Sequence, residues 1–162
     1  MNRKLAGKVA LVTGAVGEVD PAQMDRQFAI NVGGVAAAVR EASKVMAEGG
    51  RIISIGSGAA TSSPWPGIAD YSASKAAVAA YTRGWARDLG PKGITVNVVQ
   101  PGPIDTEMNP ADGALSDMQK GGTALGRYGR PEEIGATVAF LASQGAAFIT
   151  GASIDIDGGY NA

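Results

Sequence analysis

The sequence contains no cysteine and no histidine among its 162 residues. Without cysteine, the chain can form no disulfide framework, no thiolate nucleophile and no Cys-rich zinc site. Without histidine, Ser-His-Asp hydrolysis is excluded, and any general base must be Tyr, Lys, Asp or Glu. Acid–base chemistry therefore depends on side chains whose ordinary pKa values lie far from neutrality.

Long apolar runs and a strong net charge are also lacking. Val9–Val12 is far too short to cross a membrane. The formal net charge of −1 gives no general attraction to nucleic acid or to an anionic membrane surface. With 45% hydrophobic and 18% charged residues, the composition is that of a globular domain. We therefore expect a soluble, cytoplasmic protein that binds neither nucleic acid nor membranes.

Short apolar runs alternate with longer helical patterns along the chain. The runs predict strands at residues 8–13, 51–55, 94–99 and 153–156. The helical patterns run from Asp20 to about Glu48, from Asp70 to Leu89 and from Pro131 to about Ala142, with one short helix at most between residues 104 and 130. Strands that alternate with helices predict a single domain, residues 1–162, with a parallel α/β sheet and right-handed crossovers.

The first predicted helix has defined ends and an unusual centre. Asp20 is expected at its N-cap and Pro21 at its first position, and Gly49-Gly50 is expected to stop it. Gly33-Gly34 lies in its middle, where each glycine costs about 1 kcal/mol relative to alanine. This pair predicts a kink or a close packing contact.

Tyr71 and Lys75 are four residues apart near the start of the second predicted helix, so their side chains share one face. A free tyrosine has a pKa near 10 and is a poor base at neutral pH, but a neighbouring cation favours the phenolate. Tyr71 could then exchange a proton with a hydroxyl or carbonyl oxygen. Alone, Tyr-x-x-x-Lys is short and common enough to be an ordinary helix face.

Ser57 changes that interpretation. It follows the strand predicted at residues 51–55, and open α/β sheets bind ligands at the carboxyl ends of their strands. A serine there could hydrogen-bond the reacting oxygen. The strand predicted at residues 94–99 leads into Pro101 and Gly102 at the same edge.

From about Asp20 to Ala162 the sequence resembles the later part of a classical short-chain dehydrogenase/reductase, and is similar to the bacterial 3-oxoacyl-acyl-carrier-protein reductases. Residues of this kind in this order are typical of that family. The resemblance is carried by the segments Phe28–Val32, Ile53–Ser57, Tyr71–Ala77, Asn97–Pro103, and Gly126–Glu133 with Asp157–Gly159. It implies a truncated, Rossmann-like three-layer α/β/α fold with about four parallel strands.

The resemblance also implies a catalytic set of Asn31, Ser57, Tyr71 and Lys75. Tyr71 would be the general acid/base and Ser57 would orient the carbonyl. Lys75 would lower the pKa of Tyr71 and hold the nicotinamide ribose, and the backbone of Asn31 would anchor a proton-relay water. The implied activity is NAD(P)-dependent carbonyl reduction or alcohol oxidation.

A cofactor, NAD or NADP, follows from the same resemblance. Its implied contacts are Gly14, Lys75, Pro101, Gly102, Ile104 and Thr106. A small carbonyl or alcohol substrate would be bordered by Trp65 with the loop at residues 61–67, and by residues 103–118. The many small residues of the helix predicted at residues 70–89 permit close helix packing, and we expect a homo-oligomer, a dimer or tetramer. No metal site is expected.

The sequence departs from the family in its glycine-rich loop. After Gly14, the two later glycine positions of the family pattern are occupied by Glu18 and Asp20, which would repel a pyrophosphate. Two βα units and a further strand, roughly 80 residues, should intervene near residues 15–18. We therefore expect Val9–Thr13 to occupy the slot of the family's fourth strand, beside Arg51–Ile55. One edge and one face of the sheet would then lose their cover.

Three interpretations stay open at this stage. The chain is a working NAD(P)-linked reductase, as its intact tetrad indicates, or a catalytically impaired deletion form that folds and oligomerises without binding a dinucleotide, as its altered phosphate loop indicates. A third interpretation is cofactor-free acid–base chemistry by Tyr71 and Lys75.

Overall fold

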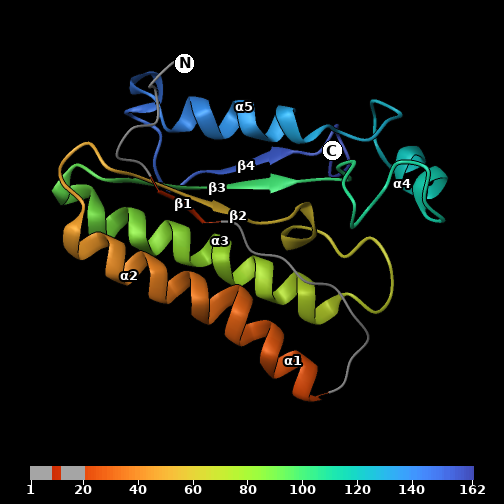
Figure 1. Cartoon of the computed structure of the whole chain (residues 1–162), viewed down its shortest axis with the longest axis horizontal. Coiled ribbons are helices and arrows are strands. Elements are labelled where there is room, and N and C mark those ends of the chain that lie inside the picture. The colour runs from red at the N-terminus through yellow and green to blue at the C-terminus, as the bar shows by residue number, and fades with distance from the viewer. Residues whose placement is uncertain (1–8, 12–20) are drawn as a thin grey trace.

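The sheet is parallel and four-stranded in the computed structural model, which describes residues 9–11 and 21–162. Its strands are β1 (Val9–Leu11), β2 (Arg51–Ile55), β3 (Thr95–Pro101) and β4 (Ser153–Ile156), in the order β1-β2-β3-β4. Because all four run in the same direction, their carboxyl ends meet at one edge of the sheet (Figure 1).

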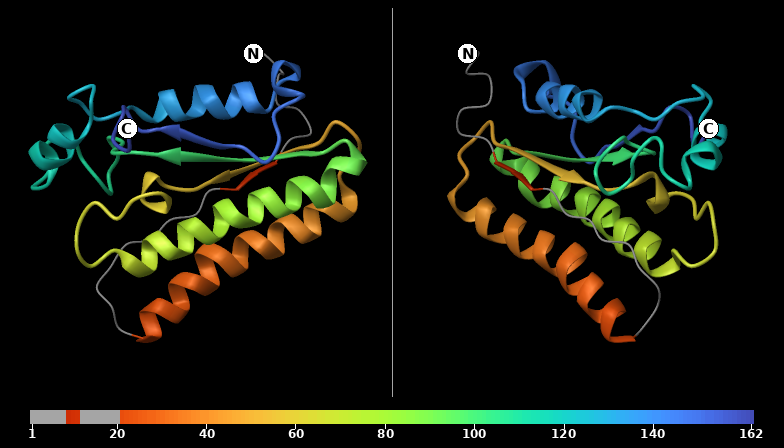
Figure 2. Two further views of the ribbon diagram at one scale, coloured as in Figure 1. Left: turned by 180° about the vertical axis from the view of Figure 1, so that it is seen from behind. Right: turned by 45° about the vertical axis from the view of Figure 1, so that its right-hand side comes forward.

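Helices cover the two faces of this sheet. On one face lie α1 (Pro21–Phe28), α2 (Val35–Val45) and α3 (Ala69–Leu89), and on the other lies α5 (Pro131–Leu141). Figure 2 shows the two helix layers on opposite sides of the strands. The short helix α4 (Ser116–Gly122) stands beyond the carboxyl edge. The predicted three-layer α/β/α architecture is confirmed.

The position of β1 confirms the hypothesis that the first strand borders β2. Val9 pairs with Ile52 and Leu11 with Ser54, in parallel register. The remainder of the predicted strand, residues 8, 12 and 13, and the predicted N-cap Asp20 lie outside the described residues. Within the described residues, β1 therefore forms the edge of the sheet.

Strand β3 begins and ends later than the predicted range 94–99. It runs to Pro101 because pairing with β4 continues there, Pro101 lying opposite Ile156. Proline has no N–H, but the next residue supplies the ladder bond: Gly102 N donates to Ile156 O at 3.1 Å. This extension carries β3 one step further toward the carboxyl edge.

The first helix is interrupted by a π-helical segment, residues 29–34, where one long α-helix was predicted. Gly33 and Gly34 occupy its last two positions. A Cβ at either glycine would meet only a carbonyl of its own helix, at 3.9 and 3.8 Å. The expected close packing contact is therefore absent at both glycines, and the irregularity is a π-bulge instead.

The same helix ends at Val45, before the predicted stop near Glu48. Val45 is 85% exposed, whereas Met46 turns into an extended conformation and packs against the core. Burying the Met46 side chain thus ends the helix. Gly49, with φ of 79°, then turns the chain toward β2.

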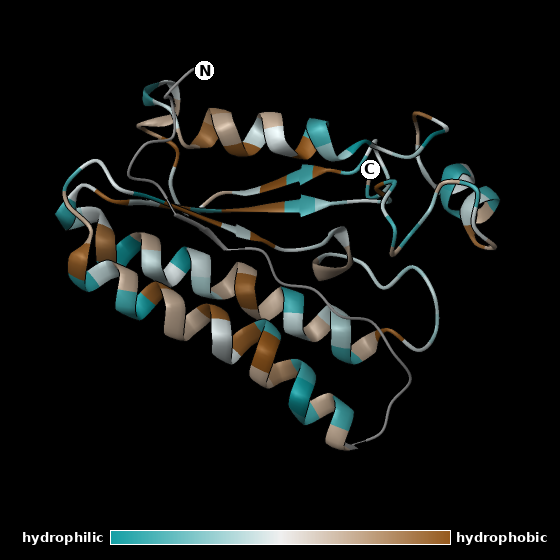
Figure 3. Ribbon diagram, in the orientation of Figure 1, coloured by the Kyte–Doolittle hydropathy of each residue, from teal (hydrophilic) through white to brown (hydrophobic). Residues whose placement is uncertain are grey.

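Two apolar clusters sandwich the sheet. Alternate residues of β3 supply both, since Val96 and Val98 face α2 and α3 while Val99 faces α5. All three are fully buried, as expected for a central parallel strand. Figure 3 shows hydrophobic colour along β2 and β3 and hydrophilic colour toward the carboxyl end of β3. Of the helices described, none is long and apolar enough to span a membrane.

Gln100 links three strands at the carboxyl end of the sheet. Its side chain is 1% exposed; Oε1 accepts from Ser57 N at 2.6 Å and Nε2 donates to Ser153 Oγ at 3.0 Å. The amide lies over Gly56, where a Cβ would stand 2.0 Å from Gln100 Oε1. Only glycine therefore fits at position 56, between the end of β2 and Ser57.

We predict that Gly56→Ala destabilises the protein by about 1–3 kcal/mol, because the added methyl group overpacks the buried amide of Gln100. Gly84→Ala is the matched control. Beyond the backbone of its own helix, no atom of the described residues lies within 4 Å of a Cβ at Gly84 in α3, so this change should stabilise the helix by up to about 1 kcal/mol. Urea unfolding of both variants checks the prediction, and equal effects would contradict it.

Candidate active site

Ser57 stands directly beyond the carboxyl end of β2. Its backbone is extended, and its Oγ accepts from Ala59 N at 3.2 Å, which caps a short 3₁₀ turn at residues 58–60. The Gln100 side chain holds Ser57 N from the β3 side. The serine is thus held at its amide by one strand and at its hydroxyl by its own turn, with the side chain half-buried.

Tyr71 and Lys75 project from the first turns of α3 toward the same place. The Tyr71 phenol is hydrogen-bonded to the Ser57 side chain. The Lys75 side chain is 1% exposed; its Nζ lies 5.7 Å from the centre of the Tyr71 ring and donates to Ile55 O at 3.3 Å. The predicted face of α3 therefore points at the end of β2, and three of the four tetrad residues converge there.

Burial dominates the electrostatics of this cluster. Burial raises the pKa of Tyr71, and the hydrogen bond from Ser57 only partly opposes that rise. Burial also lowers the pKa of Lys75 from its ordinary value to about 8. The pKa of Tyr71 is therefore raised overall and not lowered as expected, because desolvation of the phenol outweighs its hydrogen bond with Ser57.

Asn31 is completely buried in the π-helical segment. Its Nδ2 donates to Ser74 Oγ at 3.3 Å, and Ser74 Oγ donates in turn to Tyr71 O at 2.7 Å. Among the described residues, Asn31 Oδ1 has no hydrogen-bond partner. The π-bulge thus places the asparagine against the helix that carries Tyr71 and Lys75, and leaves one buried acceptor open.

The described residues expected on the nicotinamide side lie at the end of β3 and in the chain that follows it. Pro101 ends β3, and Gly102 packs so tightly that a Cβ would lie 2.7 Å from Asp157. Ile104 is half-buried and pairs with Gly129, and Thr106 is exposed, its Oγ1 accepting from Asn109 N at 3.2 Å. Gly14, the remaining expected cofactor contact, lies outside the described residues.

The segment at residues 126–133 is hydrogen-bonded to the chain that follows β3. Asp105 N donates to Gly129 O, and Gly129 N donates to Pro103 O, both at 2.9 Å. Arg127 and Glu133 form a two-bond ion pair at 2.8 and 2.9 Å that closes the segment at the start of α5. The segment Gly126–Glu133, which carries part of the family resemblance, therefore holds the chain that follows β3 in place.

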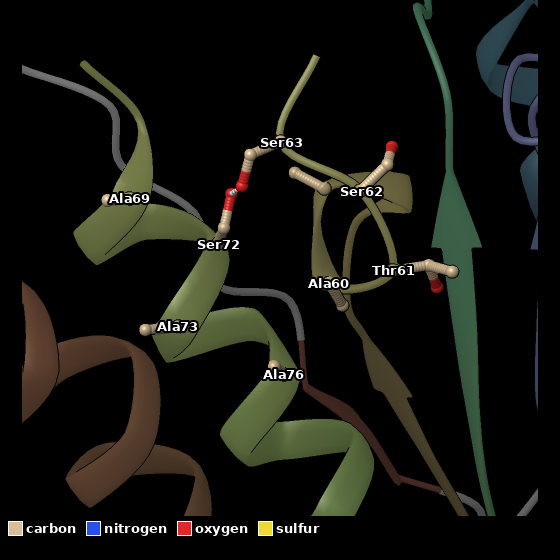
Figure 4. Close-up of a pocket in the computed structure, with 9 residues that line it drawn as sticks. Ala60, Thr61, Ser62, Ser63, Ala69, Ser72, Ala73 and Ala76 are labelled. Carbon is tan, nitrogen blue, oxygen red and sulfur yellow. Dashed lines mark hydrogen bonds between the residues drawn. The ribbon is translucent and has the colours of Figure 1, made fainter. Parts of the chain in front are cut away.

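A shallow pocket of about 280 Å³ lies beside the tetrad and not in it. Figure 4 shows it between the turn after Ser57 and the first half of α3, where Ser63 Oγ donates to Ser72 Oγ at 3.1 Å. Its α3 lining comprises Ala69, Ser72, Ala73 and Ala76. By helical periodicity this is a different face of α3 from the one carrying Tyr71 and Lys75.

Two positions of the site were not predicted from the sequence. Gln100 holds Ser57, and Ser74 links Asn31 to Tyr71. Ser74 could have been suspected from its position one turn after Tyr71, but a serine on a helix is equally compatible with a solvent-exposed position. Gln100 alternates with Val99 on a fully buried strand, and a polar residue in such a strand needs a partner.

Comparison with known proteins places this arrangement in a family. The family model described as enoyl-(acyl carrier protein) reductase matches residues 4–161. The chain belongs to the short-chain dehydrogenase/reductase family. Other members include 3-oxoacyl-[acyl-carrier-protein] reductase from Vibrio cholerae, which is 45% identical over 68% of this chain and 45% of its own length.

Other relatives match a larger share of this chain than the Vibrio cholerae protein does. The cyclic-di-GMP-binding biofilm dispersal mediator protein of Escherichia coli is 48% identical over 93% of this chain. A short-chain dehydrogenase from Burkholderia cenocepacia, solved in complex with NADP, has a TM-score of 0.92 at 43% identity over 94% of this chain and 64% of its own. A Serratia marcescens short-chain dehydrogenase/reductase has a TM-score of 0.90 at 49% identity, covering 96% of this chain and 67% of its own.

This chain spans 64% of the length of the Escherichia coli relative. That partial coverage agrees with the shortened form inferred from the sequence. The high structural similarity over nearly the whole chain shows that the retained part keeps the Rossmann-like arrangement of the family.

We predict that Lys75→Met makes the protein more stable at pH 7, by roughly 2–3 kcal/mol, because the wild-type fold buries an ammonium whose pKa is lowered to about 8. Between pH 8 and 10.5 the unfolded chain binds more protons at this site than the folded chain. The free energy of unfolding of the wild type should therefore rise relative to that of the variant as pH increases through this window.

Urea unfolding at pH 7 and at pH 10 measures the difference. Lys44→Met is the control for removal of a lysine, since the Lys44 side chain is 65% exposed. A stability difference for Lys75→Met that stays constant across the window would contradict the prediction.

Proposed function

We propose that this chain carries the proton-transfer centre of an NAD(P)-dependent carbonyl reductase. The observation that supports this most directly is the convergence of Tyr71 and Lys75 on the end of β2, beside Ser57, at the carboxyl edge of a parallel sheet. A raised pKa keeps the Tyr71 phenol protonated at neutral pH, which suits a proton donor. The same centre would accept a proton when the reaction runs as alcohol oxidation.

In this proposal the substrate oxygen replaces the Tyr71 oxygen as the acceptor of the Ser57 hydroxyl, so that Ser57 and Tyr71 both donate to the substrate. Ser57 holds the carbonyl oxygen, and Tyr71 donates its proton to that oxygen as the carbon is reduced. The backbone carbonyl of Ile55 holds the Lys75 ammonium beneath the ring, where it stabilises the tyrosinate left behind. Asn31 lies next to this group through Ser74, and its open Oδ1 suits a bound water that returns a proton.

The residues present fit the nicotinamide half of a dinucleotide. Lys75 would bind the ribose hydroxyls, and the chain from Pro101 to Thr106 would border the ring and the nearest phosphate. Bound there, a reduced nicotinamide would supply the hydride. The phosphate-loop positions, with Glu18 and Asp20 in place of glycine, disfavour the other half.

The proposed substrate is a small carbonyl compound with an apolar part. The segment that follows the nicotinamide side exposes Met108, Leu115 and Met118, at 77%, 53% and 52%. Together with Trp65 in the facing loop, these side chains would contact an apolar group. Self-association into a dimer or tetramer and a cytoplasmic location stay predictions, and sedimentation of the purified protein tests the former.

The first test is binding of NADPH and NADH followed by cofactor fluorescence. We expect a dissociation constant below about 1 mM that is lost in Lys75→Ala and retained in Lys44→Ala, whose lysine is exposed. The family function for this chain would be refuted by absence of binding at several millimolar. That result would support the deletion form that folds without a dinucleotide.

The second test separates proton transfer from cofactor binding. Tyr71→Phe should lower the rate of carbonyl reduction at least about 100-fold, because it removes the proton donor. The affinity for NADPH should change little, since the ring remains. Equal activity of Tyr71→Phe and wild type would exclude Tyr71 as the acid, whereas loss of both activity and NADPH binding would indicate a structural role.

A further inference from the structure

The C-terminal segment, residues 157–162, lies against the turn that carries Ser57. Asn161 Nδ2 donates to Gly58 O at 3.1 Å, and Asn161 Oδ1 accepts from Ser62 Oγ. A Cβ at Gly58 would lie 2.7 Å from Asn161 Nδ2, so the two groups are in close contact. In Figure 1 the C-terminus lies at the carboxyl edge of the sheet, between β4 and α4.

The backbone of Asn161 is itself held in place. The Asp157 carboxylate accepts from Gly159 N at 2.9 Å and from Asn161 N at 3.0 Å. Gly158 and Gly159 both have positive φ, 65° and 78°, which lets the chain turn back tightly after β4. The position of the Asn161 side chain is therefore set by the end of the sheet, independently of the turn it contacts.

Tyr160 extends the same contact to the two loops that border the site. Its ring meets Trp65 edge-on, with centroids 6.5 Å apart and planes at 80°. A Cβ at Gly122 in α4 would lie 2.5 Å from the Tyr160 ring. Consecutive residues of the C-terminal segment thus touch the turn after Ser57, the loop containing Trp65 and helix α4.

We propose that Asn161 is a positioning residue for Ser57. Gln100 holds the amide of Ser57 from the β3 side, and Asn161 holds the carbonyl of the next residue, Gly58, from the β4 side. With the backbone fixed on both sides, the Ser57 hydroxyl stays directed at Tyr71. The inference deepens the proposed function, because it concerns the same Ser57–Tyr71 pair, but its test needs neither dinucleotide nor substrate.

The test uses NMR of the whole chain with two readouts near Ser57. The first is hydrogen exchange of the Ala59 amide, which donates to Ser57 Oγ. The second is the pH titration of the Tyr71 ζ carbon, because the Ser57 hydrogen bond lowers the pKa of this phenol. For Asn161→Ala we expect roughly tenfold faster exchange at Ala59, equivalent to losing one hydrogen bond, and a Tyr71 titration displaced to higher pH.

Two further variants separate the two hydrogen bonds of the Asn161 side chain, one to Gly58 and one to Ser62. Asn161→Asp keeps an acceptor for Ser62 but loses the donor to Gly58 O, so it should behave like Asn161→Ala. Ser62→Ala keeps the Gly58 contact and should behave like wild type. Gln144→Ala, an exposed change outside the site, is the control for general effects.

The proposal is overturned if Asn161→Ala and Asn161→Asp leave both readouts at their wild-type values. It is also overturned if exchange accelerates equally throughout the protein, since that shows only a contribution to overall stability. Should Asn161→Ala fail to fold, the comparison of Asn161→Asp with Ser62→Ala decides between the outcomes. A chain that binds no cofactor could still show the expected shifts, so failure of the proposed function remains distinguishable.

Discussion

The pairing of β2 with β3 is the constraint on which the rest of the structure depends. These two strands run parallel over five paired residues, from Arg51 with Thr95 to Ile55 with Val99, and both are buried on both faces. Parallel strands must be joined by a crossover, and the crossover here is α3. The connection therefore returns the chain across the sheet with Tyr71 and Lys75 at the carboxyl end of β2, where Ser57 leaves the strand.

Several buried polar groups form hydrogen bonds that fix the site residues relative to this strand pair. The Gln100 amide joins β3 to Ser57 and to β4, and the Asn31–Ser74 bond joins the first helix to α3. Buried polar groups are costly unless they are hydrogen-bonded, so each such bond favours one arrangement over its alternatives. The same burial has an electrostatic consequence. It favours a neutral Tyr71 and makes protonation of Lys75 costly.

The shortened N-terminal half leaves this constraint intact. β1 adds to the free edge of β2 in parallel register, so the central pair keeps a neighbour on each side. The C-terminal segment, residues 157–162, contacts the turn after Ser57, the loop containing Trp65 and α4. In the proposed function, the proton-transfer groups and the nicotinamide contacts belong to the retained strands and helices, whereas the phosphate-loop positions lie in the altered part of the sequence.

The sequence by itself determined the fold class and the four strands. These depend on local patterns of apolar runs and turn residues, and the four-residue spacing puts Tyr71 and Lys75 on one helix face. The tetrad of Asn31, Ser57, Tyr71 and Lys75 as a catalytic set follows from the resemblance to the family and stays a prediction. It also predicted that β1 would border β2, because the first strand would take the slot of the family's fourth strand and lead directly into the helix that begins at Pro21. Tertiary structure alone decided the π-bulge at residues 29–34, the role of Gln100 and the contact between Asn161 and Gly58. It also reversed the expected pKa shift of Tyr71. Each of these depends on how deeply a group is buried and on which distant residue meets it, and neither quantity is encoded in local sequence spacing.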